Sequence, residues 1–125
     1  MTSRTERILI IDSDERARSE LGRYLEARGF YVTGYSDLAS ARSLFDDNIP
    51  DIIFADLSPD AIGELAGRLE DAETFTPIVA CYSTADASEI VNALRAGAAD
   101  IVLKPCSDDR GALDDVIGKL FDRVR

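Results

Sequence analysis

Four short polar stretches each follow an apolar run, and they carry the side chains best suited to phosphate or metal chemistry. Asp12-Ser13-Asp14-Glu15 follows the first of these runs, and Asp56 follows a later one. Tyr82-Ser83-Thr84 and Lys104-Pro105 follow the last two. Carboxylates in close company repel and need a cation, and Mg²⁺ binds through a few carboxylates and keeps several waters. A carboxylate beside Mg²⁺ can attack a phosphoryl group, while a lysine and a hydroxyl hold its oxygens.

Each of these residues also has a purely structural interpretation. Ser13 and Asp14 are suited to capping the helix that follows them. Asp56 alone is an acceptable turn residue, and Lys104-Pro105 could form an ordinary loop. Of the three neighbouring hydroxyls we favour Thr84 as a helix cap and Ser83 as the phosphate contact. Tyr82 is then either an altered switch residue or part of a binding face.

The positioning elements follow from the pattern of apolar residues. Five short apolar runs predict strands at residues 7–11, 30–35, 51–55, 76–82 and 100–103. Stretches with helical spacing lie between and after them, one ending at Gly29, one beginning at Ser36, one over 61–72, one ending at Gly97 and one over 113–124. Strands that are apolar throughout indicate an α/β fold whose parallel sheet has helices on both sides. In such sheets ligands bind at the carboxyl ends of the strands, where the polar stretches lie.

Composition restricts the classes of protein. The 125 residues fit a single domain, and 24 acids against 14 bases give a net charge of −10, which argues against direct nucleic-acid binding. No apolar run approaches the roughly 18 residues of a membrane span, and the start shows no signal peptide. The absence of histidine makes a zinc site improbable. With only Cys81 and Cys106, which we read as packing residues, we expect a reduced, cytoplasmic protein and no catalytic triad.

Three motifs carry a resemblance that covers nearly the whole chain. They are "ILIIDSDE", "PDIIFADL" and "AGAADIVLKP", in this order and spacing. The chain resembles the response-regulator receiver domains of two-component signalling. The resemblance implies a flavodoxin-like, five-stranded doubly wound sheet of order 2-1-3-4-5 with five helices. It also implies that Asp56 accepts a phosphoryl group from a histidine kinase or phosphotransfer protein, with Mg²⁺ held by Asp12, Asp56 and the Ser58 carbonyl. Lys104 would bind the phosphoryl group, and Pro105 would follow a cis peptide bond.

The sequence departs from the family pattern at four places. Ser13 replaces the second acid after the first strand, which predicts weaker metal binding unless Asp14 compensates. Tyr82 occupies the position of the family's threonine or serine, so Ser83 must serve if a hydroxyl is to contact the phosphoryl group. Ile101 replaces the aromatic switch residue, and the loop after Asp56 is one residue short.

The stretch from Tyr82 to Pro105 is also similar to the receiver of a sigma-factor adaptor, some relatives of which carry a phosphatase domain. On that resemblance residues 1–125 are a single receiver, either complete or the N-terminal module of a longer regulator. A partner or output domain is expected at the face formed by the fourth helix, fifth strand and fifth helix, and a homodimer is compatible with this. Three functions stay open: a phosphorylation-controlled receiver with no enzyme activity beyond self-phosphotransfer and self-dephosphorylation, a phosphorylation-independent binding module, and a flavodoxin-like redox protein. The acidic "DSDER" loop argues against the third.

Overall fold

Five parallel strands form the central sheet. The computed structural model describes residues 6–41, 49–84, 86–104 and 110–124. The strands are β1 (Arg7–Ile11), β2 (Tyr31–Tyr35), β3 (Ile52–Ala55), β4 (Ile78–Tyr82) and β5 (Asp100–Leu103). They pair in the order β2-β1-β3-β4-β5, all parallel, which confirms the predicted fold class and strand order.

Four helices lie within the described residues, where five were predicted for the chain. They are α1 (Glu15–Ala27), α3 (Pro59–Asp71), α4 (Ala87–Ala96) and α5 (Arg110–Val124). The predicted helix beginning at Ser36 differs from what is found: residues 36–41 form bends and turns, and Asp37 Oδ1, not Ser36, accepts a hydrogen bond from the Ser40 amide at 2.7 Å. The rest of that prediction falls on residues 42–48, outside the described residues.

Side-chain caps mark where α1 and α4 begin. Asp14 caps α1 by accepting hydrogen bonds from the amides of Arg16 and Ala17. Thr84 was predicted to cap α4, and this was wrong: Asp86 does so, accepting from the Glu89 amide at 2.8 Å. A carboxylate immediately before the first turn is also stabilised by the positive end of the helix dipole.

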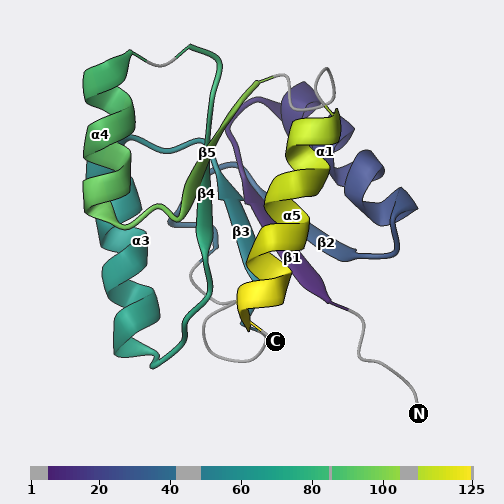
Figure 1. Cartoon of the computed structure of the whole chain (residues 1–125), viewed down its shortest axis with the longest axis horizontal. Coiled ribbons are helices and arrows are strands. Elements are labelled where there is room, and N and C mark those ends of the chain that lie inside the picture. Colours follow the sequence, from purple (N-terminus) through teal and green to yellow (C-terminus); the bar gives the residue numbers. More distant parts are fainter. Residues whose placement is uncertain (1–5, 42–48, 85, 105–109, 125) are drawn as a thin grey trace.

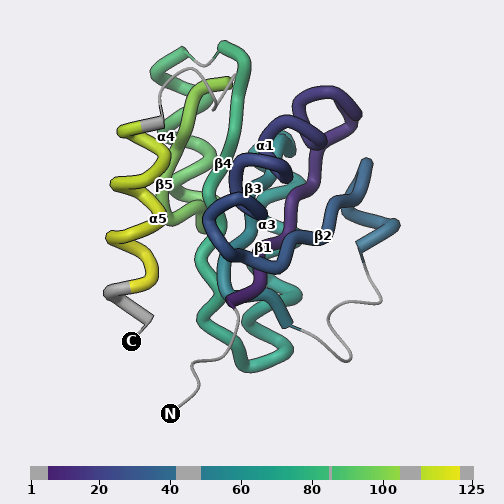
Figure 2. Tube along the Cα trace, turned by 90° about the vertical axis from the view of Figure 1, so that its right-hand side faces the viewer, coloured from purple at the N-terminus to yellow at the C-terminus, as the bar shows by residue number. Residues whose placement is uncertain are grey.

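The helices cover the sheet in two layers, as Figures 1 and 2 show. α1 and α5 pack on one face, and α3 and α4 pack on the other. Alternate residues of β4 illustrate this: Val79 and Cys81 face α1 and α5, whereas Ile78, Ala80 and Tyr82 face α3 and α4. Burial on both faces accounts for strands that are apolar throughout.

Small residues bring α3 and α4 close together. A Cβ added to Gly97, at the end of α4, would lie 2.8 Å from the Ala66 Cβ of α3. Gly97 also has a φ of +126°, which glycine adopts without strain. This contact fixes α4 against α3 on the face that also holds Tyr82.

On the opposite face, α1 is joined to α5 by polar and aromatic contacts. The Tyr24 hydroxyl donates to Asp114 Oδ1 at 2.6 Å, and Arg28 forms an ion pair with Asp114 at 2.9 Å. The rings of Phe30 and Phe121 stack with centroids 5.5 Å apart. α5 is therefore held against α1 at a distance from the carboxyl ends of the strands.

The first prediction concerns the α3–α4 contact. We expect Gly97→Ala to lower the free energy of unfolding by about 3 kcal/mol, because the substitution adds both backbone strain and a clash with Ala66. Gly29→Ala is the matched control, because Gly29 also has a positive φ, +94°, but has no atom within 4 Å of an added Cβ. It should cost about 1 kcal/mol. Equal losses in urea denaturation of the two variants would contradict the steric role of the contact.

Candidate functional site

Asp12 and Asp56 lie side by side because β1 and β3 are parallel neighbours. Ile11 pairs with Ala55 at the end of the two strands, and each aspartate is the next residue. The Asp56 amide donates to the Ile11 carbonyl at 2.8 Å, which carries the pairing one residue further. The sheet therefore brings the two carboxylates predicted to act together to one edge.

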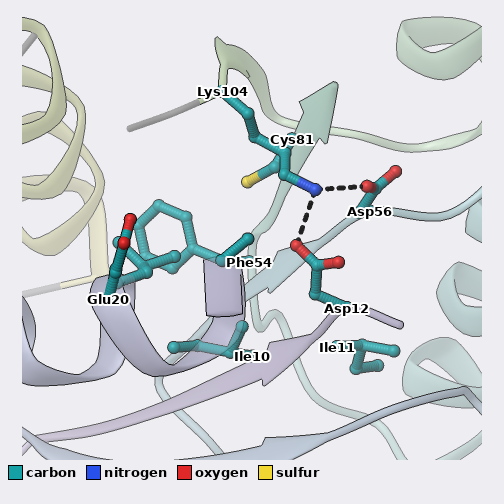
Figure 3. A pocket seen from close by; sticks show the side chains of 10 residues that line it. Ile10, Ile11, Asp12, Glu20, Phe54, Asp56, Cys81 and Lys104 are labelled. Carbon is teal, nitrogen blue, oxygen red and sulfur yellow. Dashed lines mark hydrogen bonds and ion pairs between the residues drawn. The ribbon is translucent and has the colours of Figure 1, made fainter. Parts of the chain in front are cut away.

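Lys104 joins these two carboxylates. Its Nζ lies 2.8 Å from Asp12 Oδ2 and 2.6 Å from Asp56 Oδ2 (Figure 3). The Lys104 amide donates to the Tyr82 carbonyl at 2.8 Å, which extends the β4–β5 pairing and aims the side chain across the end of the sheet. Burial acts to lower the pKa of Lys104, but its hydrogen bonds and charge interactions with Asp12 and Asp56 raise it well above the ordinary value. The ammonium is therefore charged at neutral pH and balances the two acids.

Both carboxylate oxygens of Asp12 have a partner in the protein. It is only 5% exposed, and while Oδ2 binds Lys104, Oδ1 accepts the Asp14 amide at 2.9 Å. Arg18 Nη1 donates to the Asp12 backbone carbonyl at 2.6 Å. Arg18 was not predicted as part of the site. Its position one turn into α1 gives no sign in the sequence that its guanidinium reaches back to the end of β1.

Asp56 is the more accessible carboxylate. Its side chain is 32% exposed, and Oδ2 binds Lys104. The other oxygen, Oδ1, accepts no hydrogen bond from the residues that the structure describes. A partly exposed carboxylate that is held through one oxygen and open at the other has the arrangement of a nucleophile.

The remaining predicted metal residues have other contacts. Ser13 is exposed, and Asp14 uses its carboxylate to cap α1. Ser58 caps α3: its hydroxyl accepts from the Ala61 amide at 3.2 Å, and its carbonyl accepts from the Ile62 amide at 2.9 Å. A carbonyl oxygen has a second lone pair, so the bond to Ile62 leaves Ser58 one acceptor position.

The donor set fits a magnesium ion held by few protein ligands. In the described part of the chain, no group of three or more His, Cys, Asp and Glu side chains is placed to share a metal ion. Asp12 and Asp56 already direct one oxygen each toward a single positive centre, the Lys104 ammonium. Mg²⁺ commonly uses one or two carboxylates and keeps several waters. The site therefore suits Mg²⁺, with fewer acids than the family pattern.

The altered positions on β4 and β5 have distinct environments. Tyr82 is buried, and its hydroxyl donates to the Leu57 carbonyl at 2.8 Å. Ser83 is exposed next to the strand end, and Ile101 is partly buried on the face of α3 and α4. The hydrogen bond from Tyr82 to Leu57 was not predicted, because spacing in the sequence gives the strand register of a residue but not the position of the end of a long side chain. Pro105, the predicted cis-peptide residue, lies outside the described residues, as does Cys106.

An apolar hollow lies beside the charged groups. Asp12, Asp56 and Lys104 line it together with Ile10, Ile11, Ala17, Glu20, Leu21, Phe54 and Cys81 (Figure 3). Cys81 is buried, as expected for a packing residue. Apolar walls reduce the local dielectric, which strengthens the interaction of Lys104 with the carboxylates.

The fold and this site define a class. A doubly wound parallel sheet carries two aspartates and a lysine at the carboxyl ends of its strands, where ligands bind in this class of α/β fold. The sequence matches the family described as "Response regulator receiver domain" over residues 8–115. The chain belongs to the response regulator receiver domain family. Among residues 6–41, 49–84, 86–104 and 110–124, no helix has both the length and the apolarity needed to cross a bilayer.

Similar proteins include regulators with other domains attached. The chain is 36% identical over 124 residues to a protein-glutamate methylesterase/protein-glutamine glutaminase of Rhodopseudomonas palustris, covering 95% of this chain and 34% of that protein. It is 34% identical over 101 residues to the regulatory protein AtoC of Escherichia coli, covering 79% and 22%. A two-component response regulator from Clostridium difficile has a TM-score of 0.83 at 26% identity, covering 97% of this chain and 99% of that one. The chain thus spans well under two thirds of the curated relatives' length.

The second prediction tests the charge balance at the site. We expect Lys104→Met to lower the free energy of unfolding by about 3 kcal/mol, because it leaves two neighbouring carboxylates without their cation. The raised pKa of Lys104 means that this stabilisation is complete below the unfolded pKa of about 10.4 and is lost only as the pH rises through the folded value. The loss in free energy of unfolding, relative to the unsubstituted protein, should therefore be the same at pH 7 and pH 9.

Lys119→Met is the matched control for this prediction. Lys119 is 62% exposed and lies 3.8 Å from Asp100, so its loss should cost less than about 0.5 kcal/mol. Chemical denaturation at both pH values measures the two losses. A similar small loss for Lys104→Met would show that the site does not depend on its ammonium.

Proposed function

We propose that this chain is a phosphorylation-controlled switch domain that accepts a phosphoryl group on Asp56 from a histidine kinase or a phosphotransfer protein. The observation that supports this most directly is the arrangement of Asp56. One oxygen is bound to Lys104, and the other accepts no hydrogen bond from the described residues. Asp56 also follows β3 at the carboxyl edge of the sheet, beside Asp12.

The reaction forms one bond and breaks one. An oxygen of Asp56 attacks the phosphorus of a phosphohistidine, and the new O–P bond forms as the P–N bond of the donor breaks. The departing imidazole nitrogen keeps the electron pair and takes a proton from solvent, and Asp56 becomes an acyl phosphate. Lys104, already 2.6 Å from Asp56, then pairs with the phosphoryl oxygens.

Asp12, Asp56 and the Ser58 carbonyl would hold Mg²⁺, with Asp14 as a further candidate. Bound there, the ion supplies positive charge to the phosphoryl oxygens. Ser83 is the candidate hydroxyl for the phosphoryl group, since it is exposed directly after β4. Because Ser13 stands in place of an acid, the protein supplies less negative charge to the cation than the family pattern does.

The domain would pass its state to an output domain or a separate partner. Three large apolar side chains on α4 and β5 are exposed: Val91, Leu94 and Leu103. Leu103 is 59% exposed. An apolar surface of this kind suits a protein partner or a second copy of the chain at the face of α4, β5 and α5. The greater length of the relatives supports a role as one module of a larger regulator. The net charge of −10 argues against direct nucleic-acid binding by this domain. On this proposal the domain lies in the cytoplasm and has no enzyme activity beyond self-phosphotransfer and self-dephosphorylation.

The third prediction tests Asp56 as the phosphoacceptor. Incubation with a small phosphodonor such as acetyl phosphate and Mg²⁺ should add one phosphoryl group, measured by intact mass. Asp56→Asn should abolish the addition because an amide is a far poorer nucleophile than a carboxylate. Asp60→Asn is the matched control, since Asp60 is exposed in the first turn of α3. Labelling that persists in Asp56→Asn would overturn the assignment, and no labelling of the unsubstituted protein would favour the phosphorylation-independent binding module.

The fourth prediction concerns the metal. Ser13→Asp should tighten Mg²⁺ binding about tenfold, because a third carboxylate near Asp12 and Asp56 raises the ligand charge. Ser19→Asp adds the same charge at an exposed position of α1 and should change the affinity little. Titration of both variants with Mg²⁺ by calorimetry measures the difference. Unchanged affinity in Ser13→Asp would show that this position does not reach the ion.

A further inference from the structure

The short connection from β3 to α3 is held at three successive residues. The Asp56 amide donates to the Ile11 carbonyl at 2.8 Å. The Leu57 carbonyl accepts from the Tyr82 hydroxyl at 2.8 Å, and the Ser58 carbonyl accepts from the Ile62 amide at 2.9 Å. Asp56 therefore lies between a backbone bond to β1 on one side and a side-chain bond to β4 on the other.

The Leu57 carbonyl depends on Tyr82 because it lies outside the hydrogen bonding of α3. Within the helix register its partner would be the Ala61 amide, but that amide donates to the Ser58 hydroxyl at 3.2 Å. Pro59, at the first position of the helix, has no N–H to offer. A carbonyl that is partly shielded from water and lacks a partner is costly, and the phenol supplies the missing donor.

Tyr82 is well suited to act as a fixed donor. It is 4% exposed and packs on the face of α3 and α4, so its ring has little freedom. Burial, followed by the nearby charges of Glu89 and Asp56, raises the pKa of Tyr82 above its ordinary value. The hydroxyl consequently keeps its proton at neutral pH and continues to donate.

We propose that Tyr82 is a positioning residue for phosphoryl transfer to Asp56, because its hydroxyl fixes the peptide that follows the nucleophile. This inference rests on the proposed function. Asp56 must present one oxygen to phosphorus in line with the leaving group, and small errors of position in such a step are expensive in rate. A serine or threonine at this position is too short to replace a phenol that reaches from β4 to the Leu57 carbonyl.

Tyr82→Phe is the informative substitution. It keeps the ring that packs against α3 and α4 and removes only the donor to Leu57. Tyr24→Phe is the matched control, because it removes a hydroxyl of similar geometry, the 2.6 Å bond to Asp114, from the α1–α5 contact. Urea denaturation should show that both variants fold, with similar modest decreases in midpoint.

Phosphorylation kinetics separate positioning from packing. With acetyl phosphate and saturating Mg²⁺, we expect Tyr82→Phe to lower the maximal rate about tenfold while the half-saturating donor concentration changes less than about twofold. The reason is that Lys104 still binds the donor while Asp56 is less well oriented. Tyr24→Phe should keep both parameters at the values of the unsubstituted protein.

Amide hydrogen exchange gives a second readout without phosphodonor or Mg²⁺. Tyr82→Phe should speed exchange at the amides of Asp56 and Ile62, because their hydrogen bonds hold the chain just before and just after Leu57. Exchange at the amides of β1 should not change. Tyr24→Phe should leave both groups of amides unchanged.

Each outcome decides the inference. A lowered maximal rate together with faster exchange at Asp56 and Ile62, in Tyr82→Phe alone, supports it. A normal maximal rate in Tyr82→Phe, with the unsubstituted protein phosphorylated on Asp56, overturns it and leaves the proposed function intact. Equal rate losses in both tyrosine variants overturn it in favour of a general loss of stability. No phosphorylation of the unsubstituted protein overturns the proposed function and this inference with it.

Discussion

The ammonium of Lys104 lies within 2.8 Å of carboxylate oxygens on both Asp12 and Asp56, and this contact ties the ends of β1, β3 and β5 together. Two adjacent carboxylates at the edge of a parallel sheet would repel each other, and their closeness is imposed by the pairing of Ile11 with Ala55. Lys104 balances them at a distance that one side chain can span, because β4 alone separates β3 from β5. The same contact holds Asp56 through one oxygen, while its other oxygen accepts no hydrogen bond from the described residues.

Tyr82 and the start of α3 meet at the Leu57 carbonyl. α3 begins at Pro59, directly after its cap at Ser58, so only Leu57 lies between Asp56 and the cap. Leu57 precedes the cap, so its carbonyl lies outside the hydrogen bonding of the helix, and Tyr82 supplies a donor from β4. A short hydroxyl at position 82 would not reach this partly buried carbonyl and would leave it without the donor. The phenol of Tyr82 therefore holds the residue that connects Asp56 to the start of α3.

The sheet could be predicted from the sequence because strands buried on both faces are apolar throughout and end in distinctive polar residues. The same reasoning brought Asp12, Asp56 and Lys104 to one edge. Capping was less predictable: Thr84 and Asp86 both satisfy the residue preference, and only the position where α4 begins selects Asp86. The tips of Arg18 and Tyr82 could not be located, because long side chains reach partners that register alone does not specify.

The start of α3 at Pro59 has a consequence for how a change at Asp56 can spread. A displaced Leu57 peptide acts directly on α3, because no flexible residues separate the two. α3 in turn cannot move along α4 without disturbing the contact between Ala66 and Gly97, where there is no room for even one added carbon. Ile101 provides no aromatic ring on β5, whereas α3 and α4 share a packed face, so α3 offers one packed route from Asp56 to the exposed apolar residues of α4. In this chain the two halves of that route meet at Tyr82, which bonds the loop after Asp56 and packs on the face that α3 and α4 share.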